Sequence, residues 1–175
     1  MWIFGYGSLV WKADFPYTHR LIGYVKGYMR RFWQASEDHR GIPGKPGRVV
    51  TILPSPDPEK FWGVAYEIAK EDEAFVIKHL DYREKNGYDK VTVKFFPSCS
   101  PLPNDPFDLV LYVGREDNEY FAGAADIESI AQQIVSSVGP SGTNTEYLYK
   151  LASAMRLLAP GIHDEHLFAL EAALT

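Results

Sequence analysis

The chain has 175 residues, of which 46% are hydrophobic and 23% are charged. This length and composition are typical of one compact globular domain, so we expect a single domain over residues 1–175. The formal net charge is −5 and no basic stripe is present, which argues against nucleic acid as a partner.

Cys99 is the only cysteine, so no disulfide can form within the chain. The N-terminal residues lack the basic start and long apolar run of a signal peptide. No stretch approaches the roughly 18 consecutive apolar residues that a membrane helix needs. We therefore expect a cytoplasmic protein that uses neither a membrane nor an obligate protein partner.

In the first two thirds of the chain, β-branched and aromatic runs predict strands, and clusters of Gly and Pro predict loops. The predicted strands are Met1–Phe4, Leu21–Trp33, Arg48–Leu53 paired with Phe61–Ile68, Tyr88–Phe96, and Leu109–Val113. The predicted loops are Gly5–Ser8, Gly41–Gly47 and Pro54–Pro58. Acidic residues followed by apolar residues at helical spacing predict one helix over Glu71–Asp81.

The last third changes to a helical period. A stripe of apolar residues runs from Ile127 to Val138 behind a possible cap at Asp126, and Gly139-Pro140 ends it. Thr143-x-x-Glu146 has the form of a capping box for a helix that ends before Pro160-Gly161. Asp164 is the expected cap of a final helix through Leu174. Strands first and helices last predict an α+β fold, with a curved sheet or barrel packed by helices.

The segment Phe4-Gly5-Tyr6-Gly7-Ser8-Leu9 is the first candidate site. It is not a dinucleotide-binding fingerprint, because Val10 stands where the third glycine is required. Glycines still allow a backbone to approach a ligand closely, and successive N–H groups can bind an anion. A plain hairpin turn explains the same residues equally well.

The second candidate is Glu84, in the charged segment Leu80–Tyr88 at the end of the predicted Glu71–Asp81 helix. Charged residues at a helix end are usually solvated, and the periodicity alone favours that interpretation. The position matters only when it is considered together with the N-terminal glycines.

Taken together, the two segments resemble the γ-glutamylcyclotransferase superfamily: Tyr6-Gly7-Ser8-Leu9 is followed about 75 residues later by Glu84. Other stretches are similar to the ChaC family within it, most of all to its glutathione-specific second-paralogue branch. These stretches are Arg30–Gln34, Asp38–Gly41 with Gly47–Thr51, and Gly139–Leu148. The departures from the family pattern are small, with Val10, Tyr82 and Asn86 at positions where isoleucine, phenylalanine and glycine are more usual.

The resemblance implies a small mixed β-barrel flanked by helices, and an enzyme without metal or cofactor. It implies cleavage of glutathione into 5-oxo-L-proline and L-cysteinylglycine, with Glu84 as the acid–base residue. The substrate-binding residues that it implies are Ile3, Phe4, Gly5, Tyr6, Gly7, Ser8 and Leu9, through their backbone, and Tyr147, which would line the same pocket. Two alternatives stay open: a preference for other γ-glutamyl peptides or amines, and a non-catalytic glutathione-binding module.

The chemistry of lactam formation explains why a single carboxyl group can act as both acid and base in this reaction. The α-amine of a γ-glutamyl peptide can attack its own γ-carbonyl, so no enzymic nucleophile is needed. The amine must lose protons and the leaving nitrogen must gain one, and a carboxylate beside both can do each in turn. We therefore expect Glu84 to be partly buried among aromatic residues, with its pKa raised above about 4.3.

Four other residues invite a functional interpretation. Ser8 lacks the Gly-x-Ser-x-Gly elbow of a serine nucleophile. His163 and His166 supply only two possible metal ligands, and polar residues at the surface of a helix start explain them better. Cys99 lies in a predicted loop without a base-bearing motif.

Arg40 and Arg48 flank the loop over Gly41–Gly47. A guanidinium group here could pair with the glycyl carboxylate of glutathione, and Arg40 is kept as a candidate substrate-binding residue. An exposed salt bridge is an equally good explanation.

Overall fold

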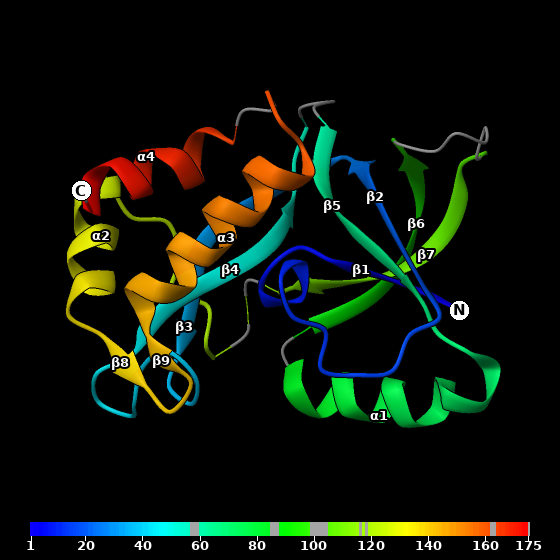
Figure 1. Ribbon diagram of the computed structural model, residues 1–175. Helices are drawn as coiled ribbons and strands as arrows, with labels where there is room; N and C mark the ends of the chain where they lie inside the picture. The colour runs from blue at the N-terminus through cyan, green and yellow to red at the C-terminus, as the bar shows by residue number, and fades with distance from the viewer. Residues whose placement is uncertain are drawn as a thin grey trace. The chain divides into compact units, whose positions relative to one another are not determined.

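The computed structural model (Figure 1) describes residues 1–56, 60–84, 88–98, 105–115, 117, 119–161 and 164–174, with only the main chain described at 82–84, 88 and 114. The chain divides into two compact units. The barrel unit comprises Met1–Met29 and Ile52–Asn118, and the helical unit comprises Arg30–Thr51 and Glu119–Thr175. One domain over the whole chain stays a prediction.

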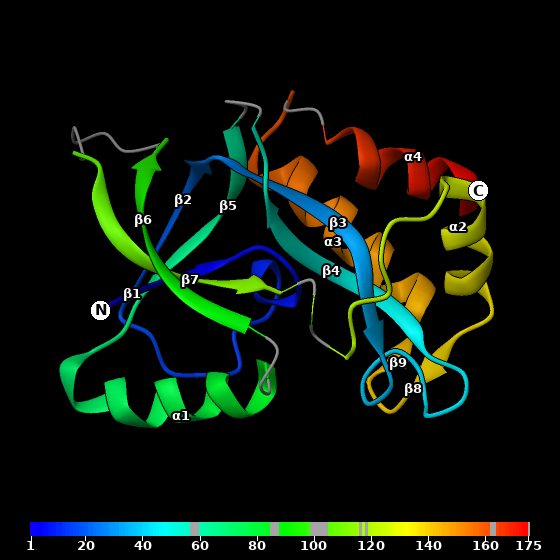
Figure 2. The same ribbon diagram turned by 180° about the vertical axis from the view of Figure 1, so that it is seen from behind.

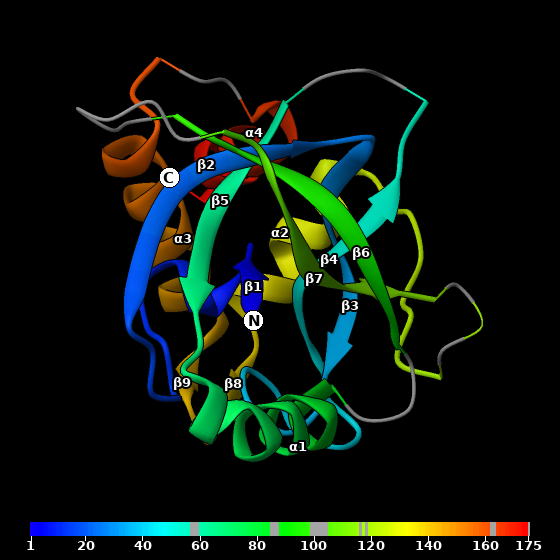
Figure 3. The same cartoon turned by 90° about the vertical axis from the view of Figure 1, so that its right-hand side faces the viewer.

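The barrel unit contains a closed barrel with the strand order β1-β5-β2-β6-β7, seen from the side of its chain start in Figure 3. Its strands are β1 (Trp2–Gly5), β2 (His19–Lys26), β5 (Lys60–Glu67), β6 (Tyr88–Pro97) and β7 (Phe107–Gly114). Neighbouring strands are antiparallel except β1 and β7, which pair in parallel at Ile3 and Val110. The predicted small mixed barrel is confirmed.

Alternate residues of these strands, together with Ile52 from β4 (Gly47–Pro54), form the core of this unit. The buried cluster is Phe4, Val25, Ile52, Phe61, Ala65, Phe95, Leu109, Leu111 and Val113. Each large apolar side chain buried in this way contributes about 1.5–3 kcal/mol. Gly23 leaves room for Phe95, because a Cβ at position 23 would lie 2.4 Å from the Phe95 ring. Three phenylalanines, Phe4, Phe61 and Phe95, are the aromatic members of this core.

One helix accompanies the barrel. A short 3₁₀ turn, η2 (Lys70–Asp72), leads into α1 (Glu73–Glu84). In Figure 1 this helix lies below the strands of its unit. The predicted helix over Glu71–Asp81 is confirmed, and it continues one turn further, so that Glu84 is its last residue.

The described residues of the helical unit form two two-stranded sheets and three helices, seen from behind in Figure 2. Its elements are most of β3 (Tyr28–Ser36) and β4 (Gly47–Pro54), then α2 (Ile127–Val135), β8 (Val138–Gly139), β9 (Gly142–Thr143), α3 (Asn144–Leu158) and α4 (Glu165–Leu174). Thr143 Oγ1 accepts a hydrogen bond from Glu146 N at 3.1 Å, so the predicted cap of α3 is confirmed. Asp164 Oδ1 accepts one from Leu167 N at 3.1 Å and caps α4. Asp126 occupies the N-cap position of α2, but its side chain makes no capping bond.

Three expectations about strands and helix ends were wrong. The single strand over Leu21–Trp33 is two strands, because Gly27 adopts a left-handed conformation with φ of 87°. The proposed pairing of Arg48–Leu53 with Phe61–Ile68 does not occur: β4 pairs with β3, and β5 lies between β1 and β2. The α2 helix stops at Val135, and Val138 belongs to β8.

None of the helices in the described part of the chain is long and apolar enough to cross a membrane.

Candidate functional site

The glycine turn, Gly5–Val10, leaves the barrel directly after β1. Ile3 and Phe4 are each 2% exposed, and Phe4 packs against Phe61 and Phe95 in the core. Their side chains therefore belong to the barrel, and only main-chain groups here could meet a ligand. Tyr6, Gly7, Ser8 and Leu9 are half-buried, with Ser8–Val10 forming a 3₁₀ turn.

Close packing explains Gly5. A Cβ on Gly5 would lie 2.8 Å from Leu9 Cβ and 3.4 Å from the Tyr66 ring. Only glycine lets the 3₁₀ turn fold back this tightly on the end of β1. The plain hairpin of the alternative interpretation is not what forms, because the segment Ser8–Val10 is a helical turn.

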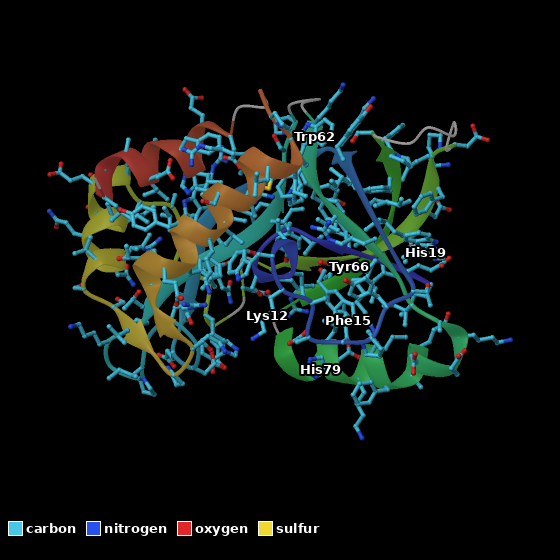
Figure 4. All side chains as sticks on the ribbon, in the orientation of Figure 1. Lys12, Phe15, His19, Trp62, Tyr66 and His79 are labelled. Atoms are coloured by element: carbon cyan, nitrogen blue, oxygen red, sulfur yellow. The ribbon has the colours of Figure 1, made fainter. Side chains whose placement is uncertain are left out.

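Side chains of the barrel hold the turn by its carbonyl groups. Tyr66 Oη donates to Leu9 O at 2.5 Å, and Arg20 Nη2 donates to Val10 O at 3.3 Å. Burial raises the pKa of Tyr66, so its hydroxyl stays protonated and remains a donor. The Tyr66 ring also meets Phe15 edge-on with ring centroids 5.5 Å apart. Both residues are labelled in Figure 4. Arg20 and Tyr66 are partners in the pairing of β2 with β5, so two neighbouring residues of the barrel wall hold the turn.

A further tie joins the segment after the turn to α1. His79 Nε2 lies 3.1 Å from Asp14 Oδ2, and His79 stands on α1 facing that segment in Figure 4. Asp14 follows the glycine turn closely in the chain, and His79 precedes Glu84 on the helix. The two candidate segments therefore belong to one connected part of the barrel unit.

Glu84 ends α1, and its side chain lies outside the described residues. Its expected partial burial and raised pKa therefore stay predictions. Cys99 and His163 also lie outside the described residues.

The remaining family-like stretches meet within the helical unit. Their glycines pack without space for a side chain. A Cβ would lie 2.1 Å from Gly47 N at Gly41, 2.4 Å from Arg40 O at Gly47, and 2.3 Å from His39 O at Gly139. These segments, far apart in the sequence, form one tightly packed corner at the start of α3.

Tyr147 is buried in this unit, with 6% of its surface exposed. Its hydroxyl accepts a hydrogen bond from Val50 N at 3.2 Å, and its ring meets Phe32 edge-on at 5.9 Å. The Arg40 guanidinium lies 5.7 Å from the centre of the same ring. The two predicted substrate-binding residues of the helical unit thus lie together.

Arg40 is not the exposed salt bridge of the alternative interpretation. It is 8% exposed, and its Nη1 donates to Glu146 Oε2 at 2.8 Å and to Thr143 O at 3.0 Å. The Arg40 hydrogen bond and then Lys150 hold the pKa of Glu146 below its usual value. Glu146 therefore stays ionised and keeps the guanidinium oriented at the start of α3.

Arg48 is equally buried but makes a different set of contacts. Its Nε donates to Gln133 Oε1 at 2.8 Å, and its Nη1 donates to Phe32 O at 3.1 Å and Gly123 O at 3.0 Å. Burial lowers the pKa of Arg48. This side chain cross-links β3, β4 and α2, which the sequence pattern did not reveal.

His166 corrects another expectation, since it is not a surface residue at a helix start. Its Nε2 accepts a hydrogen bond from Phe32 N at 2.9 Å, and its ring stacks on Phe32 at 6.0 Å. Burial, followed by the charge of Arg31, lowers its pKa to about 4. Asp164, from the same motif, pairs with Arg30 at 2.7 Å. Within the described ranges no three His, Cys, Asp or Glu side chains are arranged to hold a metal ion.

A family model and two curated relatives show which proteins this chain is similar to. Residues 1–175 match the family model described as ChaC-like protein. The glutathione-specific gamma-glutamylcyclotransferase 1 of Danio rerio is 46% identical over 99% of this chain and 88% of its own length. The Homo sapiens protein of the same name is 45% identical over 97% of this chain and 76% of its own.

Solved structures agree at the level of the fold. A crystal structure of a yeast gamma-glutamyl cyclotransferase specific to glutathione superposes with a TM-score of 0.89, at 33% identity, over 99% of this chain and 95% of that one. A structure titled gamma-glutamyl cyclotransferase has a TM-score of 0.57 at 14% identity, which supports the fold alone. Assignment to the second-paralogue branch stays a prediction. The chain belongs to the ChaC-like protein family.

Proposed function

We propose that this chain is an enzyme that cleaves glutathione into 5-oxo-L-proline and L-cysteinylglycine. The observation that carries the proposal is its 46% identity, over 99% of the chain, with a glutathione-specific γ-glutamylcyclotransferase. The glycine turn and the helix that ends in Glu84, the two segments that the resemblance assigns to the site, belong to one compact unit. A cytoplasmic location is part of the same proposal, and the single cysteine supports it.

The proposed reaction needs no nucleophile from the protein. The substrate's α-amine attacks its γ-carbonyl, a five-membered lactam closes, and the bond to the cysteinyl nitrogen breaks. Holding amine and carbonyl in line is worth up to about 7–11 kcal/mol of the barrier. The tied glycine turn suits this task, because a binding surface that does not move preserves the alignment.

Glu84 carries the proton transfers in this proposal. Its carboxylate takes in turn the two protons that the α-ammonium nitrogen loses, one before the attack and one as the lactam closes, and it returns one to the leaving nitrogen and the other to solvent, a contribution of about 10²–10⁴-fold. Main-chain N–H groups of the turn bind the anionic parts of the γ-glutamyl unit, its α-carboxylate or its developing oxyanion. Tyr147 is proposed as a substrate contact on the family resemblance, and Arg40 because a guanidinium group can pair with the glycyl carboxylate of glutathione.

Incubation with glutathione, followed by mass spectrometry, tests the proposal. We expect 5-oxo-L-proline and cysteinylglycine in equal amounts. Parallel reactions with γ-Glu-Ala measure selectivity, and we expect glutathione to be turned over faster. Binding of glutathione without either product would contradict catalysis, and faster turnover of γ-Glu-Ala would contradict the substrate assignment.

A further inference from the structure

Tyr112 on β7 connects the two segments that the proposed function places around the substrate. Its main-chain oxygen accepts a hydrogen bond from Tyr6 Oη at 2.7 Å. Its own hydroxyl donates to Asp81 Oδ1, on α1, at 3.0 Å. One residue therefore contacts the glycine turn through its backbone and the last turn of α1 through its side chain.

The contact with α1 precedes Glu84 by less than one turn of the helix. Asp81 and Glu84 are three residues apart in α1, so their main-chain positions move together. A shift of Asp81 relative to the barrel would carry the end of α1, and Glu84 with it. In Figure 3 this helix lies beneath the barrel strands of its unit.

An aspartate in the last turn of a helix, as Asp81 is, destabilises the helix unless another side chain binds its carboxylate. A negative charge in the last turn of a helix opposes the helix dipole and costs stability. Two side chains compensate: Tyr112 binds Oδ1, and Lys90 Nζ lies 3.4 Å from Oδ2. Lys90 and Tyr112 stand opposite each other across β6 and β7, so both project from the same place on the barrel wall.

The contact between Tyr112 and the glycine turn is also held in place by packing. Tyr6 lies between the two glycines of the turn, and its ring packs on Phe4 and Phe61 of the barrel. Tyr112 itself is 6% exposed, and its side chain projects from the face of β7 opposite to Leu109, Leu111 and Val113, which fill the barrel interior. A buried residue that bonds both segments has little freedom to let them move apart.

We infer that Tyr112 is a positioning residue, which sets the distance between the glycine turn and the end of α1 that carries Glu84. The inference rests on the proposed function and assigns Tyr112 no contact with substrate. Its hydroxyl acts through Asp81, and its carbonyl acts through Tyr6.

Tyr112→Phe tests the inference, because it removes the bond to Asp81 and keeps the ring and the carbonyl. We expect kcat for glutathione to fall about 10–100-fold, since a misplacement of about 1 Å can cost this much, with KM changed less than about threefold. The matched control is Tyr24→Phe, which removes a hydroxyl from the outer side of the same barrel, and it should keep the parent kcat.

Variants of Asp81 test the same bond from its other end, where the side chain is 46% exposed and substitution threatens folding less. Asp81→Asn keeps the oxygen that accepts from Tyr112 and should retain most activity, whereas Asp81→Ala should match Tyr112→Phe. The double variant Tyr112→Phe/Asp81→Ala should be no slower than Asp81→Ala, because both substitutions remove the Tyr112–Asp81 bond and Asp81→Ala already removes the exposed contact with Lys90 as well.

The outcomes separate this inference from the proposed function. If the parent protein turns over glutathione but Tyr112→Phe and Asp81→Ala keep its kcat, Tyr112 does not position the site. Additive losses in the double variant would also contradict the inference. If the parent protein releases no product from glutathione, the proposed function itself fails.

Discussion

The side-chain amide of Asn144 binds both main-chain polar groups of Arg48. Arg48 N donates to Asn144 Oδ1 at 2.7 Å, and Asn144 Nδ2 donates to Arg48 O at 2.8 Å. Asn144 is fully buried at the first residue of α3, so the amide replaces a strand partner for β4. One side chain thereby fixes the start of α3, which carries Tyr147, against the sheet.

We expect Asn144→Ala to lower the free energy of unfolding by about 2–4 kcal/mol, because two buried main-chain groups lose their partners. Denaturant titration followed by circular dichroism measures the change. Gln132→Ala, at an exposed position of α2, should shift the midpoint little. An equal shift in both variants would show that the double hydrogen bond is not the cause.

His166 should make stability depend on pH. Its pKa is lowered to about 4 in the folded protein by burial, so the unfolded chain binds a proton near pH 6 that the folded protein does not. Stability therefore falls as the pH drops from about 6.5 toward 4, by up to about 3 kcal/mol from this group. Protonation at Nε2 would also break the bond from Phe32 N.

The measurement is the denaturation midpoint between pH 7 and pH 4. His166→Gln removes the titrating group and should flatten this dependence, whereas Gln132→Ala, which removes no titrating group from an exposed position of α2, should leave it unchanged. A parent-like pH dependence in His166→Gln would contradict the assignment.

Glu84→Gln should preserve the helix and remove most turnover. The loss expected for a missing general acid–base residue is about 10²–10⁴-fold in kcat. Glu71→Gln is the matched control, since it makes the same substitution at an exposed position before the start of α1. Near-parent release of 5-oxo-L-proline by Glu84→Gln would remove this residue from the proposed mechanism.

Gly5→Ala should damage the site more than the fold. The new methyl group would meet Leu9 Cβ at 2.8 Å and push the turn away from the end of β1, so we expect kcat/KM for glutathione to fall at least about tenfold. Gly161→Ala is the comparison: position 161 has φ of 83° and nothing within 4 Å of a Cβ, so it should lose stability but not activity. Unchanged kcat/KM in Gly5→Ala would mean that the turn tolerates displacement.

Arg40 can be tested with a modified substrate. If it binds the glycyl carboxylate, Arg40→Met should raise the KM for glutathione about tenfold or more, the value of one charged hydrogen bond. The KM for the glycyl ethyl ester of glutathione, which lacks that negative charge, should be unchanged by the substitution. An equal rise for both substrates would restrict Arg40 to its contacts with Glu146 and Thr143.

Local signals in the sequence predicted much of the fold. The apolar run before Gly5 gave β1, and helical periodicity with the capping residues Thr143 and Asp164 gave α3 and α4. These features depend on neighbours within a few residues, so the sequence contains the information directly.

The errors concern contacts between distant residues. The residue pattern of Phe61–Ile68 predicts a strand, but no nearby residue predicts that this strand pairs with β1 and β2. His166 lies among polar residues and reads as exposed, yet Phe32 and Trp33, more than 130 residues earlier, cover its ring. The buried role of Arg48 depends in the same way on Gln133 and Gly123. The position of Glu84 was predicted from a resemblance, because its local pattern favours a solvated helix end.

The parallel pairing of β1 with β7 has a consequence for biosynthesis. The strand β1 can close the barrel only after a segment about a hundred residues later in the chain has been made, since Ile3 pairs with Val110. Contacts of such long sequence separation slow folding and leave strand edges open in the meantime. Nascent chains that end before β7 should accordingly expose an unpaired edge of β1. We expect chaperones to bind these incomplete chains.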